Sequence, residues 1–141
     1  AKSAPTKKIF VTRKDALTRQ LINQEELLMA LAGFEPVELS KYSISEQMQI
    51  FDSATHVVAT HGAGLANLIW CQHGTKVIEI NHIEQIDKKV YPILSQHCGH
   101  IHKVLYGEKI KLNHKNKPVG VKRLNDMANI KINVQEVLQC L

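Results

Sequence analysis

The chain has 141 residues, 44% of them hydrophobic, which is typical of one globular domain with a substantial buried core. Its formal charge of +5 favours anionic partners such as phosphates, although a basic solvated surface explains the same excess. Aromatic residues make up only 5%, and no apolar run approaches the roughly 20 residues of a membrane span, so base stacking on nucleic acid and a transmembrane segment are both disfavoured.

The first part of the chain alternates between strand and helix patterns. A strand is predicted over Lys8–Thr12, and apolar residues at helical spacing predict a helix over Ile22–Ala32. A short strand follows over Pro36–Leu39. Ser43 and Glu46 have the spacing of a capping box and predict the start of the next helix.

The same alternation continues through the middle of the chain. Strands are predicted over His56–Thr60 and Lys76–Ile80, and the helix between them over Ala63–Trp70. A helix is expected over Glu84–His97, with a break or kink at Pro92.

The last part begins with an alternating strand pattern over His100–Tyr106. The polar, lysine-rich stretch Gly107–Gly120 is predicted to be a loop, and Asn133 to cap a final helix over Val134–Leu141. Repeated strand–helix units with strands apolar on both faces predict an α/β fold, a Rossmann-like three-layer sandwich with a mainly parallel sheet of about five strands. Ligands of such folds bind beyond the carboxyl ends of the strands.

The most informative motif is the turn His61-Gly62-Ala63-Gly64-Leu65, which joins a buried strand to a helix. Glycines allow close approach to the backbone, and a helix N-terminus offers free N–H groups, so the turn suits a phosphate. It matches neither the dinucleotide fingerprint nor a P-loop. A tight turn without a ligand explains the pattern equally well.

Charged and polar residues fall at the same predicted edge of the sheet. Arg13 follows the first strand and has the fork geometry to grip a diphosphate, with Arg19 six residues on, although both also fit a solvated surface. The sequence leaves three roles open for His61: a hydrogen-bond donor to a phosphate or leaving group, a general base, or a structural histidine. Asn67 either orients the turn or only occupies the helix.

Glu79 interrupts an apolar strand near its end. It is expected either to accept hydrogen bonds from ribose hydroxyls or to be a charge at the solvent edge of the sheet. The cluster His97-Cys98-Gly99-His100-Ile101-His102 places His100 and His102 on one strand face, but its spacing matches no standard zinc site, so no metal is expected. Three scattered cysteines do not indicate a disulfide framework, and Cys71 shows no sign of a catalytic nucleophile.

The ordered motifs resemble the family 61 glycosyltransferases, which include plant xylosyl- and arabinosyltransferases, animal protein O-linked N-acetylglucosaminyltransferases and bacterial polysaccharide-synthesis proteins. The resemblance spans about residues 8 to 105. It departs from the family pattern where Thr12 replaces serine before Arg13 and Gln24 replaces glutamate after Asn23. It rests on Val11-Thr12-Arg13-Lys14-Asp15, Arg19, Asn23, Glu25-Glu26-Leu27, Leu39, Ser45-Glu46-Gln47, Phe51, Ala54, HGAGLANLIW, Gly74-Thr75 and Val77-Ile78-Glu79-Ile80.

The resemblance implies that residues 1–141 form one donor-binding domain, the C-terminal half of a two-domain GT-B type enzyme whose N-terminal domain lies outside this chain. It implies an inverting transfer from a nucleotide-diphosphate sugar, most often uridine-linked, to a glycan or protein hydroxyl, as in polysaccharide biosynthesis. Arg13, Arg19 and the turn, Gly62 to Leu65 with Asn67, would bind the donor, with Glu79 a weaker carry-over. Such enzymes need no bound metal.

Within that scheme His61 is expected to stabilise the leaving group rather than to act as the base, which would lie on the other domain. The fragment alone would then turn over little or nothing. Its natural location is expected to be cytoplasmic, or membrane-associated through regions outside this chain, and no nucleic-acid partner is expected. A non-catalytic nucleotide- or phosphate-binding module is the alternative, and a metal-dependent hydrolase built on the histidine cluster is a third, weaker hypothesis.

Overall fold

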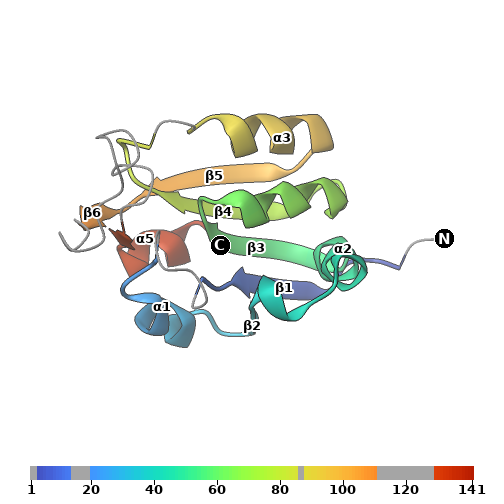
Figure 1. The fold of residues 1–141 in the computed structure, drawn as a ribbon, viewed down its shortest axis with the longest axis horizontal. Coiled ribbons are helices and arrows are strands. Elements are labelled where there is room, and N and C mark those ends of the chain that lie inside the picture. Colours follow the sequence, from blue (N-terminus) through green and yellow to red (C-terminus); the bar gives the residue numbers. More distant parts are fainter. Residues whose placement is uncertain (1–2, 14–19, 86–87, 111–128) are drawn as a thin grey trace.

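The computed structural model describes residues 3–13, 20–85, 88–110 and 129–141. A parallel sheet of five strands runs through the molecule in the order β2-β1-β3-β4-β5 (Figure 1). This arrangement confirms the predicted α/β, Rossmann-like architecture. The strands are β1 (Lys7–Val11), β2 (Phe34–Val37), β3 (Ala54–Thr60), β4 (Lys76–Asn81) and β5 (Ile101–Tyr106).

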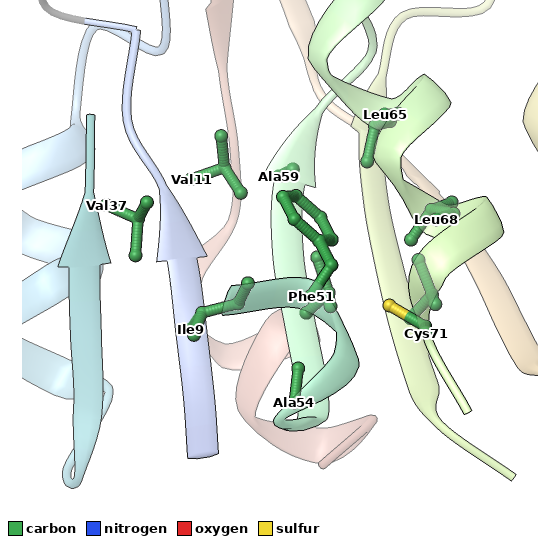
Figure 2. Close-up of a cluster of buried hydrophobic side chains, with 11 residues drawn as sticks. Ile9, Val11, Val37, Phe51, Ala54, Ala59, Leu65, Leu68 and Cys71 are labelled. Carbon is green, nitrogen blue, oxygen red and sulfur yellow. The ribbon is translucent and has the colours of Figure 1, made fainter. Parts of the chain in front are cut away.

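Helices cover both faces of the sheet because the strands alternate apolar residues to both sides. On one face, α2 (Ile44–Asp52), the 3-10 helix η2 (Ala63–Trp70) and α3 (Val90–Cys98) pack on the sheet. Figure 2 shows this cluster, in which Phe51 of α2 and Leu68 of η2 lie against the strands, both with no exposed surface. On the other face lie α1 (Gln24–Ala30) and α5 (Val134–Gln139), which bury Leu27 and Val137 against Phe10, Val58 and Ile78.

Local sequence signals explain several element ends. The capping box is present: the amide of Glu46 donates to Ser43 Oγ at 3.1 Å, and the amide of Ser43 donates to Glu46 Oε1 at 3.3 Å. Asn133 caps α5 by accepting from the amide of Gln135 at 3.0 Å. Both caps were predicted, because these side chains satisfy amides that the first helical turn leaves without partners.

Several elements differ from the sequence prediction in their bounds or their type. The helix expected over Glu84–His97 begins only at Val90, so Pro92 is its third residue and causes no break. Proline is tolerated there because the amides of the first turn lack intrahelical acceptors in any case. The second strand ends at Val37, and the 3-10 turn η1 (Leu39–Lys41) follows. The helix after the glycine turn is present as a 3-10 helix.

The C-terminal segment is tied to the start of α1. The side chain of Asn23 donates to the Ile132 carbonyl at 2.7 Å and accepts from the Ile132 amide at 3.1 Å. In the stretch predicted to be a lysine-rich loop, β6 (Glu108–Ile110) pairs antiparallel with β7 (Asn129–Lys131), and residues 111–120 lie outside the described part. All three cysteines are free thiols. Among the described residues, no helix combines the length and apolarity needed to cross a bilayer.

Candidate functional site

A pocket opens where the strand order reverses. The chain passes from β1 to β2 on one side and then returns to β3 on the other, so the strand order reverses between β1 and β3. In α/β folds this switch point is where ligands bind. A pocket of about 190 Å³ occupies it, lined by Val11, Thr12, Arg13, Leu39, Ala59, Thr60, Gly64 and Leu65.

The pocket brings Arg13 and the glycine turn together, as the sequence predicted for the sheet edge. A Cβ atom on Gly62 would lie 2.5 Å from Arg13 Nη1, so the guanidinium rests directly on the glycine backbone. The φ of Gly62 is 166°, an extended conformation open to any residue. The close approach of Arg13, rather than backbone strain, therefore explains why a side chain is absent at this position.

The turn enters η2 with amides that face no helical acceptor. The first intrahelical bond runs from the amide of Leu65 to the carbonyl of Gly62 at 3.0 Å, so the amides of Ala63 and Gly64 precede it. Such amides, together with a nearby guanidinium, form an environment that favours an anion. Leu65 itself turns its side chain into the core, with 2% exposed.

Asn67 orients the turn, which was one of its two predicted roles. Its Nδ2 donates to the carbonyl of Gly64 at 3.1 Å and to Gln47 Oε1 on α2 at 3.1 Å. Gln47 in turn donates to the carbonyl of Leu39 at 2.9 Å. This bridge fixes Gly64 and Leu39, which lie on the pocket wall, relative to each other.

His61 and Glu79 form a buried pair beside the turn. His61 Nδ1 lies 2.7 Å from Glu79 Oε2, and the two residues are 7% and 0% exposed. The His61 ring also meets Tyr91 of α3 edge-on, with centroids 5.1 Å apart. Complete burial overturns the interpretation of Glu79 as a charge at the solvent edge of the sheet. Both its oxygens accept from histidines, so the geometry favours a role through His61 over a direct ribose contact.

The second partner of Glu79 is His102 of β5, whose Nε2 lies 2.8 Å from Oε1. Burial alone would raise the pKa of Glu79, but the hydrogen bonds and charges of His102 and His61 together lower it below its ordinary value. The carboxylate is therefore ionised at neutral pH.

Two members of the predicted histidine cluster, His100 and His102, belong to this hydrogen-bond network. His100 and His102 both meet Ser95 Oγ, at 3.3 and 2.6 Å, which confirms that they share one face. Burial lowers the pKa of His100 and raises that of Cys71 to about 12, so the Cys71 thiol stays protonated. Within the described ranges, no group of three or more His, Cys, Asp or Glu side chains is arranged to hold a metal ion.

The structure does not describe the side chains of two predicted site residues. Arg19 lies outside the described residues, and of Ala63 only the backbone is described. The sequence prediction also missed Thr12 and Thr60, which line the pocket and whose buried hydroxyl oxygens have no hydrogen-bond partner among the described residues. A signal for them exists: each hydroxyl residue directly precedes a predicted site residue, Arg13 or His61, at a strand's carboxyl end.

A family model described as Glycosyltransferase 61 matches residues 1–78 of the chain. The match includes β1, the switch-point pocket and the whole glycine turn, and it ends one residue before Glu79. No curated protein matches the chain in sequence. Because the matched region covers more than half of the chain, the chain belongs to glycosyltransferase family 61 and is an enzyme of the glycosyltransferase class.

Proposed function

We propose that this domain binds the diphosphate of a nucleotide-sugar donor, a uridine diphosphate sugar, in the pocket between β1 and β3. The proposal depends above all on one observation: the Arg13 guanidinium lies directly against Gly62 within that pocket. The guanidinium supplies a fork of donors and positive charge, from which a diphosphate accepts two hydrogen bonds, and the turn amides beside it have no acceptor within the helix.

The size of the pocket supports binding of part of a donor. About 190 Å³ is small against the roughly 300–1,000 Å³ of sites that enclose whole small molecules. In the proposal the diphosphate occupies this volume, while the nucleoside and the sugar extend beyond it. Arg13 and the first turn of η2 neutralise the phosphate charge, a task for which many transferases use a metal ion.

The proposed reaction is an inverting transfer of the sugar to a hydroxyl of a glycan or protein. The acceptor oxygen forms a bond to the anomeric carbon as the bond from that carbon to the diphosphate oxygen breaks. The proposal places the acceptor and its base on a second, N-terminal domain of a GT-B type enzyme. This chain then contributes the electrostatic stabilisation of the leaving diphosphate.

Isothermal titration of the 141-residue chain with uridine diphosphate tests the proposal. Arg13→Ala is expected to weaken binding about 10- to 150-fold, since a hydrogen bond to a charged group contributes roughly 1.5–3 kcal/mol. Lys103→Ala, on the exposed surface of β5, removes the same charge away from the pocket and is expected to leave the affinity unchanged. Absence of binding heat in the wild-type chain, or equal losses in both variants, would refute it.

A further inference from the structure

One face of the sheet changes character along the length of its strands. Toward the carboxyl ends, α1 and α5 cover this face and bury Phe10, Val58 and Ile78 (Figure 1). The other described helices, α2, η2 and α3, pack on the opposite face. No helix of the described ranges therefore covers the amino-terminal part of the first face. Both faces of a parallel sheet are ordinarily covered, so this part of the surface needs an explanation.

A row of side chains crosses the uncovered part, with one residue from each strand. The register pairs Lys8 of β1 with His56 of β3, and His56 with Lys76 of β4. Each of the three lies two residues before a core residue buried under α1 and α5, so alternation along the strand places it on that same face. We call this surface the lysine face, and its members are Phe34, Lys8, His56, Lys76, Ile101 and, next to the row on β5, Lys103.

Contacts between the side chains show that the row lies together. The Lys8 ammonium lies over the ring of Phe34, 5.9 Å from its centroid, and the His56 ring meets Phe34 edge-on with centroids 6.1 Å apart. Burial lowers the pKa of His56, and the nearby charges of Lys8 and Lys76 lower it further. His56 is therefore neutral at neutral pH, and the positive charge of the lysine face comes from its lysines.

These lysines have no acidic partner among the residues that the structure describes. No ion pair joins Lys8, Lys76 or Lys103 to a carboxylate there, whereas Lys7, the preceding residue of β1, lies 3.9 Å from Glu35. Lys8 and Lys103 are exposed, and Lys76 is half-buried. Neighbouring strands are about 4.8 Å apart, so Lys8 and Lys76 start about 10 Å from each other. The face thus presents three spaced positive charges.

We propose that the lysine face binds an anionic glycan, a polysaccharide that carries carboxylate or sulfate groups, through several ion pairs at once. The choice of a glycan follows from the membership of the chain in a glycosyltransferase family, and it rests on the proposed transfer to a glycan hydroxyl. Spaced cations suit a polymer with repeated charges, because the first ion pair raises the effective concentration for the next.

The position of the face gives the bound glycan a place relative to the donor pocket. Thr12 and Thr60, which line the pocket, follow Lys8 and His56 by four residues on the same strands. A strand rises about 3.3 Å per residue, so the two sites lie about 13 Å apart along the strands. In the proposal, the lysine face holds a part of the glycan that is remote from the reacting hydroxyl.

Other classes of anionic partner fit this face less well. The interfaces between proteins are depleted in lysine. Shallow insertion into a membrane needs a broad apolar face, whereas Ile101, 60% exposed, is the one largely exposed apolar side chain of the lysine face. Single-stranded nucleic acid binds through base stacking on aromatic side chains, and Phe34 is half-buried beneath Lys8.

Titration of the ¹⁵N-labelled chain with an oligogalacturonate, whose charges are all carboxylates, tests the proposal without any variant. The largest amide shifts are expected at Lys8, His56, Lys76 and Lys103. The methyl ester of the same oligomer keeps the sugar chain, removes the charge and is expected not to bind. Shifts centred elsewhere, or equal binding of the ester, would overturn the proposal. Uridine diphosphate, added to a separate sample, reports on the switch-point pocket, so either proposal can fail while the other stands.

Variants separate a site from a general effect of charge. Lys8→Gln, Lys76→Gln and Lys103→Gln are each expected to weaken oligogalacturonate binding about two- to fivefold, because a single exposed ion pair is weak, and the triple variant about tenfold or more. Lys7→Gln removes the same charge from a side chain that is paired with Glu35, and it is expected to leave the affinity unchanged. Equal losses in Lys7→Gln and Lys8→Gln would overturn the site.

Competitor polyanions decide the class of the partner. The affinities for a polyglutamate peptide with the same number of carboxylates, an oligothymidylate and phosphatidylserine vesicles are measured at the same ionic strength. The oligogalacturonate is expected to bind more tightly than any of these, and its affinity is expected to fall as salt rises from about 50 to 200 mM. Tighter binding of a competitor, or binding that does not depend on salt, would overturn the assignment to an anionic glycan.

Discussion

Gly62 allows ligand binding and folding stability to be tested separately. In Gly62→Ala the new methyl group would lie 2.5 Å from Arg13 Nη1, a distance that two atoms cannot maintain. The atom that must move is the far end of a flexible side chain, so the guanidinium is expected to leave its position over the turn. Because φ at this residue is 166°, alanine adopts the backbone without strain.

The two effects have different sizes. Loss of the guanidinium from a diphosphate contact removes about 1.5–3 kcal/mol of binding free energy, or about 10- to 150-fold in affinity. Folding stability is expected to stay level or to rise by about 0.4–1 kcal/mol, since alanine restricts the unfolded chain. Gly74→Ala provides the opposite case: nothing lies near its Cβ, but φ is +89°, which costs a residue with a side chain about 1–2 kcal/mol.

Calorimetric titration with uridine diphosphate and urea unfolding of both variants measure the separation. Gly62→Ala is expected to lose affinity and keep stability. Gly74→Ala, just before β4 at the amino-terminal edge of the sheet, is expected to lose stability and keep affinity. Unchanged affinity in Gly62→Ala would refute the placement of Arg13 at the ligand, and equal affinity losses in the two variants would show that binding follows general stability.

Further expectations concern stability and reactivity. Phe51→Ala, at a fully buried position, is expected to cost about 3–5 kcal/mol in urea unfolding, and a loss below about 1 kcal/mol would contradict the packing shown in Figure 2. Ser43→Ala removes the capping box of α2 and is expected to cost about 1 kcal/mol by the same measurement, whereas no change would mean that the cap contributes nothing. The pKa of Cys71 is about 12, so a thiol reagent at pH 8 is expected to spare it in the folded chain and label it after unfolding; labelling in the folded state would contradict its burial. The pKa of Glu79 is lowered on folding from its ordinary value of 4.5, so its stabilising contribution is present above that pH and is lost as the pH falls further; Glu79→Gln is expected to lack this dependence in acid unfolding curves, and identical curves would contradict it.

The sequence was sufficient to predict the layered fold and the location of Arg13 and the turn at one edge of the sheet. Strands buried on both faces leave a continuous apolar run, and parallel strands bring their carboxyl ends to one edge. These two facts place the residues after β1 and β3 at the same edge of the sheet, and the structure shows that the two strands are also neighbours. The capping residues Ser43 and Asn133 were equally predictable because their effect is local.

What the sequence did not reveal depends on distant pairing. The partner of Glu79 comes from β5, 23 residues later, and alternation of apolar residues contains no information on which strand lies beside which. The buried carboxylate was therefore assigned to a ribose contact or a solvent edge. Pro92 was interpreted as a break because the start of α3 carries no capping side chain to mark it.

The most direct test of the central claim is a titration of the ¹⁵N-labelled chain with uridine diphosphate, followed through backbone amide resonances. The account predicts that the largest shifts occur at Thr12, Arg13 and the amides from Thr60 to Leu65, which surround the switch-point pocket. Shifts centred on a separate cavity of about 470 Å³, which Asn23 and Val134 help to line, or no shifts at millimolar nucleotide, would contradict it.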